Sequence, residues 1–186
     1  MSSASGARRA DAVRNRDLAL AAAKSLLADP GAPLTVEAIA KRAGLGVGTV
    51  ARAFGSKDAL LDAAIAELLE PLVRRARAVA AAPAATDALR TLLVEVIDFE
   101  QRHSAISEQT AGLSLPQTTA RERELRDALR QVVETGREAG DIRSDIPAET
   151  TAALLTEAVH AVTQARTAPP GLADAMVAVV LDGLRP

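Results

Sequence analysis

The sequence lacks several residue types on which whole classes of function depend. Its 186 residues include no cysteine, tryptophan or tyrosine and only two phenylalanines. The absence of cysteine excludes disulfides, thiolate zinc sites and thiol nucleophiles. With so few aromatic rings, the chain has no means of building the stacking platforms that hold single-stranded nucleic acids. A chain of this length still buries a substantial core, which must therefore be aliphatic.

Long apolar runs are also absent. No stretch reaches the roughly 18 residues that a membrane-spanning helix needs, and residues 1–10 lack the apolar segment of a signal peptide. We therefore expect a soluble, cytoplasmic protein with no membrane partner. The sequence contains no glycine-rich phosphate loop and no Gly-x-Ser-x-Gly motif, so it predicts neither an enzyme nor a bound cofactor.

The small net charge of −2 hides an asymmetry along the chain. Residues 1–60 contain nine Lys and Arg against five Asp and Glu, a net charge of +4, whereas residues 61–186 contain thirteen against nineteen, a net charge of −6. A basic N-terminal segment joined to an acidic body is compatible with a nucleic-acid partner for the first segment alone.

The local patterns predict an all-α fold. Strong helix formers dominate, and no stretch of β-branched alternation bounded by turns supports a sheet. After a flexible tail over residues 1–11, we expect helices over about 11–28, 35–44, 46–54, from Ser56 past Leu72, and over 86–103, 119–139, 148–166 and 172–184. Pro71 either divides the fourth of these or acts as a hinge in it. The charged residues Arg121 to Glu124 indicate a solvated helical face.

Residues 35–54 have the pattern of a helix-turn-helix. Two short helices meet at Ala43-Gly44-Leu45, where glycine can take the positive φ that a tight interhelical turn requires. Thr35 is placed to cap the first helix. In this motif the second helix enters the major groove of DNA with its N-terminal residues at the base edges.

The stretch from Ala43 to Leu60, which reads AGLGVGTVARAFGSKDAL, resembles the signature of TetR-family transcriptional regulators with a Gly-Val-Gly-Thr recognition helix. The resemblance implies a three-helix DNA-binding head within residues 12–72 and a helical ligand-binding and dimerisation domain over 73–186. For residues 73–186 the resemblance depends only on the number of helices and on the connector over residues 139–145.

The resemblance also implies roles for individual residues. Thr35 and Lys57 match positions that bind DNA phosphates, and Val47, Gly48 and Thr49 match the positions that face the bases. Two arginines complete the predicted interface, Arg52 as a basic contact and Arg16 on the first predicted helix. The family usually has an aromatic and a basic or histidine residue beside the position of Arg52, whereas this chain has Ala51 and Ala53. Because one phosphate contact is missing, we expect either a weaker non-specific affinity for DNA or a larger contribution to that affinity from Arg8, Arg9, Arg14 and Arg16.

The only two histidines both follow a glutamate by three residues, as Glu100-x-x-His103 and Glu157-x-x-His160. Two such pairs, with a further glutamate from each of two other helices, would form a ferritin-like di-iron site. The further carboxylates would come from Glu67 or Glu70 and from Glu134 or Glu138. A metal-binding helical bundle is therefore an alternative to a regulator, although the histidines are more simply surface, core or pocket residues.

Together these patterns predict a homodimeric repressor that binds a pseudo-palindromic operator in double-stranded DNA and is released by a small, largely apolar effector. The last helix, which is apolar nearly all round, indicates a second copy of the chain as its partner. The expected ligand pocket is lined by Ile97, Phe99, His103, Val132, Val159 and His160. A dimeric ligand-binding protein that has lost DNA binding is the remaining alternative.

Overall fold

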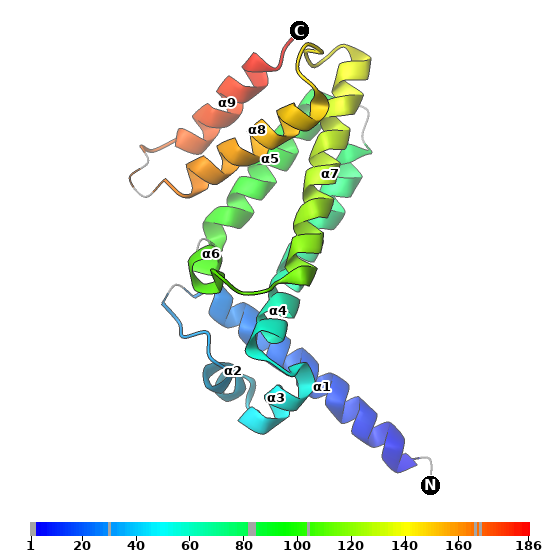
Figure 1. Cartoon of the computed structure of the whole chain (residues 1–186), viewed down its shortest axis with the longest axis vertical. Coiled ribbons are helices and arrows are strands. Elements are labelled where there is room, and N and C mark those ends of the chain that lie inside the picture. The colour runs from blue at the N-terminus through cyan, green and yellow to red at the C-terminus, as the bar shows by residue number, and fades with distance from the viewer. Residues whose placement is uncertain (1–2, 30, 82–84, 104, 166, 168) are drawn as a thin grey trace. The chain divides into compact units, whose positions relative to one another are not determined.

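The computed structural model describes residues 3–29, 31–81, 85–103, 105–165, 167 and 169–186. Within these ranges the chain forms helices only, nine in all. They are α1 (Ser3–Leu27), α2 (Val36–Ala43), α3 (Val47–Phe54), α4 (Lys57–Ala80), α5 (Ala85–Arg102), α6 (Ala105–Thr110), α7 (Pro116–Ala139), α8 (Ala148–Thr163) and α9 (Leu172–Gly183) (Figure 1). None of the helices in the described ranges is long and apolar enough to cross a lipid bilayer.

The chain divides into two compact units. The first contains residues 1–68 and 105–119, and the second contains residues 69–104 and 120–186. Each of α4 and α7 therefore contributes to both units. The sequence did not indicate that residues 105–119 join the N-terminal unit.

In the first unit, α2 and α3 pack on α1 and on each other. The core between them is aliphatic, as expected, with Leu20, Leu27, Ile39 and Val50 all buried. The predicted apolar stripe on the fourth helix is also buried, from Leu60 and Leu61 onward. Because Ala40 has a small side chain, α2 can approach its neighbours closely.

The first helix begins at Ser3, not near Asp11. Residues 7–10 read Ala-Arg-Arg-Ala, which are strong helix formers, and no proline or turn signal separates them from the periodic segment. Residues 3–11, which were expected to belong to a flexible tail, are therefore the first part of α1, and residues 1–2 of that tail lie outside the described residues. This extension carries Arg8 and Arg9 on the same helix as Arg14 and Arg16.

A buried carboxylate joins α4 to the start of α7 within the first unit. Asp62 is only 1% exposed. Its carboxylate accepts hydrogen bonds from the backbone N–H groups of Gln117 and Thr118 at 3.0 and 2.8 Å, and from the Thr118 hydroxyl at 2.9 Å. The side-chain amide of Gln117 donates a fourth at 3.1 Å. A carboxylate suits this place because the first N–H groups of a helix have no intrahelical acceptor.

Pro71 does not divide the fourth helix, which is continuous from Lys57 to Ala80. The division between the two compact units nevertheless falls close to it, between Leu68 and Leu69. Proline at this place removes the N–H that would bond to the carbonyl four residues earlier.

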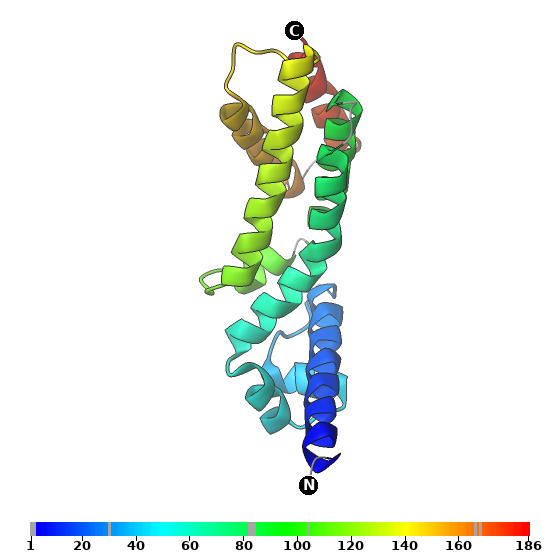
Figure 2. The same cartoon turned by 90° about the vertical axis from the view of Figure 1, so that its right-hand side faces the viewer.

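In the second unit, α5 packs against α8 and α9, which also pack against each other. Figure 2 shows α7 running beside the C-terminal part of α4. Two ion pairs join these helices, Arg77 to Glu124 and Arg121 to Glu70, each at 3.0 Å. The core is formed by leucines and valines of α5 and α7 together with residues of α8 and α9, including Leu89, Val133, Leu155 and Val177.

Candidate functional site

The turn between α2 and α3 has the geometry that the sequence predicts. Thr35 caps α2 by accepting a hydrogen bond from the Ala38 N–H at 3.1 Å. Gly44 ends the helix in the left-handed conformation with φ of +66°, and the Leu45 N–H bonds to the Ala40 carbonyl at 2.9 Å. The left-handed conformation costs other residues about 1–2 kcal/mol, so glycine fixes the angle between α2 and α3.

The first turn of α3 is exposed to solvent. Val47 is 43% exposed although it is apolar, and Gly48 beside it is exposed as well. Gly46 precedes the helix without a side-chain cap. Because the first N–H groups of a helix lack intrahelical partners, this end of α3 can accept an anionic ligand such as a phosphate.

Arg52 lies back along α3 over this turn. Its Nη2 donates to the Thr49 hydroxyl at 3.4 Å, and a Cβ added at Gly48 would stand 3.4 Å from Arg52 Nη1. Val47, Gly48, Thr49 and Arg52 therefore gather on one stretch of helix surface.

The other predicted DNA contacts lie around α3. Lys57 is exposed at the start of α4. Arg16 is already engaged with α3, because its guanidinium lies 4.3 Å from the centre of the Phe54 ring and donates to the Ala53 carbonyl at 3.1 Å. Its observed contacts thus hold the C-terminal end of α3 on α1. Ala51, at the position where the family usually has a larger side chain, is exposed, so its methyl group is the only side chain that this position of α3 offers to DNA.

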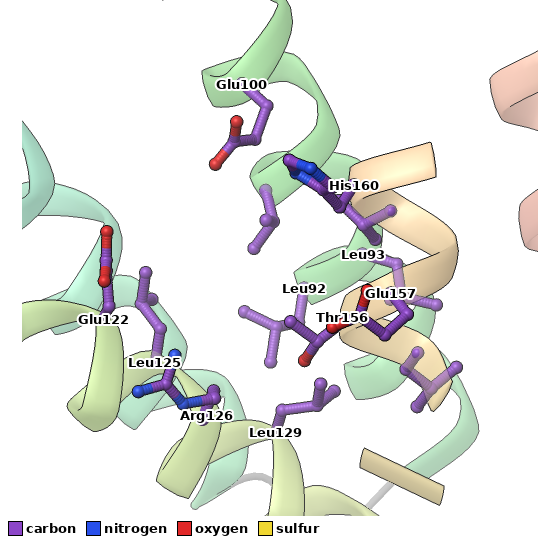
Figure 3. A pocket seen from close by; sticks show the side chains of 13 residues that line it. Leu92, Leu93, Glu100, Glu122, Leu125, Arg126, Leu129, Thr156, Glu157 and His160 are labelled. Carbon is purple, nitrogen blue, oxygen red and sulfur yellow. The ribbon is translucent and has the colours of Figure 1, made fainter. Parts of the chain in front are cut away.

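The second unit contains a cavity of about 400 Å³. This volume is within the range of small-molecule sites. Residues of α5, α7 and α8 line it, and they are Leu92, Leu93, Val96, Glu100, Glu122, Leu125, Arg126, Leu129, Leu155, Thr156, Glu157, Val159 and His160. In Figure 3 the carboxylates of Glu100 and Glu122 lie toward one end with the His160 ring beside Glu100, and Leu129 lies toward the other end.

Burial raises the pKa of Glu100 above its ordinary value of 4.5, and the Glu122 carboxylate raises it further. His160 and His103 act in the opposite direction, because their positive charge favours the ionised carboxylate. The cavity thus contains a carboxylate whose charge is poorly hydrated.

The predicted pocket residues divide between the cavity and its surroundings. Val159 and His160 line it, whereas Ile97 and Val132 are buried in the core of the second unit. Phe99 and His103 stack on each other instead, with ring centres 4.4 Å apart, and His103 Nδ1 is 2.9 Å from the Phe99 carbonyl oxygen. Of the six predicted residues, two thus line the cavity, two lie in the core and two stack on each other.

The sequence interpretation missed Glu122, Leu125, Arg126 and Leu129 of α7, all of which line the cavity. The sequence pattern places Glu122 on a solvated helical face. The signal that could have located them is their spacing, since residues at i, i+3, i+4 and i+7 share one face of a helix. This face combines two apolar side chains with two charged ones.

The alternative metal site does not assemble. Among the described residues, no group of three or more His, Asp or Glu side chains could hold a metal ion. Glu100, Glu157 and His160 line the cavity, but His103 does not. Three of the four further carboxylates form ion pairs elsewhere, Glu67 with Lys24 at 2.7 Å, Glu70 with Arg121 at 3.0 Å and Glu134 with Arg137 at 4.0 Å. The fourth, Glu138, does not line the cavity.

Comparisons with known proteins agree with this geometry. Residues 19–64 match the family model described as bacterial regulatory proteins of the tetR family, and residues 82–186 match the SbtR-like C-terminal domain of transcriptional regulators. No curated protein matches the chain at the required significance.

Several solved structures are similar over almost the whole chain. A TetR transcription regulatory protein from Mycobacterium vanbaalenii is 28% identical with a TM-score of 0.65, and covers 96% of this chain and 99% of its own. A TetR transcriptional regulator from Streptomyces coelicolor is 28% identical with a TM-score of 0.62, covering 92% and 98%. The regulator FadR from Bacillus subtilis, solved in complex with stearoyl-CoA, is 16% identical with a TM-score of 0.73, covering 90% and 98%. At that identity the last likeness concerns the fold alone.

Proposed function

Since the chain belongs to the TetR family of DNA-binding transcriptional regulators, we propose that it is a homodimeric repressor released from a pseudo-palindromic operator by a small, largely apolar effector. Two copies of α3, one DNA turn apart, would read the two half-sites. Val47 would contact thymine methyl groups, Thr49 a base or phosphate, and Arg52 a base edge or phosphate. Thr35 and Lys57 would bind phosphates.

The observation that carries the DNA-binding part is Gly48. A Cβ added there would make only an ordinary contact with the end of the flexible Arg52 side chain at 3.4 Å, and the backbone of Gly48 is helical. Glycine inside a helix costs about 0.5–1 kcal/mol relative to alanine, so the fold gains nothing from it. A glycine that the fold does not require, on the exposed first turn of α3, supports close approach of the backbone to DNA.

The dimer is supported by unpartnered apolar side chains on the last two helices. Leu154 on α8 is 59% exposed and Val179 on α9 is 72% exposed. Around Val179, the exposed Ala175 and Ala178 extend the same face of α9. Large apolar side chains on adjacent helices fit an interface between two identical subunits better than open solvent.

The effector part is supported by the cavity among α5, α7 and α8. Its leucines and valines offer an apolar wall, and the FadR fold, which is similar, holds stearoyl-CoA in its own structure. An effector would release DNA only if it binds the non-binding conformation more tightly than the DNA-binding one.

A gel shift with the DNA upstream of the protein's own gene tests DNA binding. We expect a specific shift that Arg52→Ala weakens by about 10- to 100-fold, as expected when a side chain with a base contact is removed. Gly48→Ala should weaken binding while leaving the protein at least as stable as the wild type. Arg130→Ala, which removes an exposed arginine of α7, is the matched control and should change nothing. An absence of binding even at low salt would favour a ligand-binding protein that has lost its DNA function.

Sedimentation velocity tests the dimer separately. Val179→Glu should produce monomers, because a charge would be buried in the interface. Val94 on α5 is an exposed valine outside the proposed interface, so Val94→Glu should leave the dimer intact. If Val179→Glu also remains dimeric, the interface lies elsewhere.

A further inference from the structure

The lining of the cavity in the second unit carries an excess of negative charge. Three glutamates line the cavity, Glu100, Glu122 and Glu157, against one arginine, Arg126, and the weakly basic His160. Glu122 and Glu157 are exposed, whereas Glu100 is half-buried and its carboxylate is partly removed from water. A cavity that needed only to hold a hydrocarbon would gain nothing from a half-buried carboxylate, because removing charge from water is unfavourable unless it is compensated.

These glutamates differ from others in the same unit. Glu95 bonds to Arg75 at 2.9 Å and Glu124 to Arg77 at 3.0 Å. In the described part of the chain, by contrast, none of the three cavity glutamates forms a salt bridge within 4.0 Å. The half-buried Glu100 therefore has no cationic side chain within 4.0 Å in the described part of the chain, and a cation that enters the cavity would supply one.

We propose that the effector is an amphipathic organic cation, whose apolar body packs on the leucines of α5 and α7 and whose ammonium group lies between Glu100 and Glu122. The inference rests on the proposed function, in which this cavity receives the effector.

The arrangement in Figure 3 agrees with the two parts of such a molecule. The carboxylates of Glu100 and Glu122 lie toward one end of the cavity, and the side chain of Leu129 lies toward the other. The raised pKa of Glu100, caused mainly by burial, fits the same assignment, since a cation beside this carboxylate would replace the hydration that burial removes.

An anionic amphiphile is the competing ligand class. Its charged group would have to reach Arg126 or His160 while avoiding three carboxylates. Arg126, His160, Glu122 and Glu157 are all exposed, so water screens their charges, whereas Glu100 is half-buried. The least screened charge in the cavity is therefore negative, which favours the cation.

Isothermal titration calorimetry on the full chain separates the two classes. The probes are decyltrimethylammonium and decanoate, which share an alkyl chain length and differ in charge, each used below its micelle-forming concentration. We expect the ammonium to bind at least about tenfold more tightly than the carboxylate, as the gain or loss of one partly buried charge contact would produce.

The variant Glu100→Gln should weaken binding of the ammonium by about tenfold and leave binding of decanoate unchanged or tighter. Glu95→Gln, on the same helix but outside the cavity, is the matched control and should alter neither affinity. Circular dichroism confirms that both variants fold. Tighter binding of decanoate than of the ammonium, or an unchanged ammonium affinity in Glu100→Gln, would overturn the inference.

A gel shift with each probe distinguishes this inference from the proposed function. If decanoate binds in the cavity and releases the DNA, the proposal of an effector-responsive repressor is supported and the proposal of a cationic effector is overturned. Binding of the ammonium without release of DNA would support the cavity's ligand class and contradict the proposed effector response.

Discussion

Replacement of Asp62 by alanine should destabilise the protein more than replacement of any exposed carboxylate. The side chain is 1% exposed and accepts four hydrogen bonds from Gln117 and Thr118. Gln117 is exposed and can bond to water instead, but Thr118 is buried. Its N–H would lose its acceptor, and its hydroxyl would keep only the backbone carbonyl of residue 62 at 3.4 Å. An unsatisfied buried group costs about 1–3 kcal/mol.

From these terms we expect Asp62→Ala to lower the free energy of unfolding by about 2–4 kcal/mol. Asp62→Asn keeps one acceptor oxygen and should lose about half as much. For a chain of this size, each kcal/mol lowers Tm by about 2–4 °C.

Urea denaturation followed by far-ultraviolet circular dichroism is the appropriate assay, because the chain has no tryptophan or tyrosine to report unfolding by fluorescence. Asp98→Ala is the matched control. Asp98 forms an i,i+4 ion pair with Arg102 in which both side chains are more than half exposed, so its loss should cost at most about 0.5 kcal/mol. If Asp62→Ala costs no more than Asp98→Ala, the junction between α4 and α7 does not stabilise the fold.

Three further changes test other parts of the molecule. Arg16→Ala should lower the unfolding free energy by about 1 kcal/mol, measured by the same denaturation, because the contact with Phe54 and the hydrogen bond to Ala53 are lost; no loss would mean that Arg16 does not hold α3. Gly44→Ala should cost about 1–2 kcal/mol from backbone strain alone, since φ is +66° and open space surrounds the added Cβ, and a neutral result would contradict the turn geometry. Glu100 has a raised pKa in the folded chain, so its stabilising effect is present below pH 4.5 and is lost as the pH rises through the folded value. Glu100→Gln should therefore match the wild type near pH 4 and exceed its Tm at pH 7, and equal Tm values at pH 7 would refute the burial argument.

The helix-turn-helix over residues 35–54 could be predicted from the sequence because the residues that determine its structure lie close together in the chain. Thr35, Gly44 and the apolar positions of α2 and α3 specify a cap, a turn and a packed face within twenty residues of one another, counted from residue 35 to residue 54. The family resemblance rests on the same stretch, so fold and family came from one source of information.

The parts that failed depend on contacts between distant segments. Asp62 bonds to Thr118, 56 residues away, and nothing in the local pattern around Asp62 indicates that partner. The start of α7 at Pro116 was missed although proline favours the first helical position. For the cavity, hydrophobic periodicity selected Ile97 and Val132, which are apolar and lie in the core of the second unit. The cavity is also lined by charged residues such as Glu122, which a hydrophobic pattern assigns to the solvent-exposed face of a helix.

The hydrogen bonds between Asp62 and Thr118 also bear on how such proteins can be recombined. A DNA-binding head cut at residue 72 and joined to another regulator's effector domain would lose residues 105–119, which belong to the same compact unit. Asp62 would then face whatever helix the new partner supplies. A working chimera should therefore exchange α6 and the first turn of α7 together with the head, as two separated segments of chain that are transplanted as one piece.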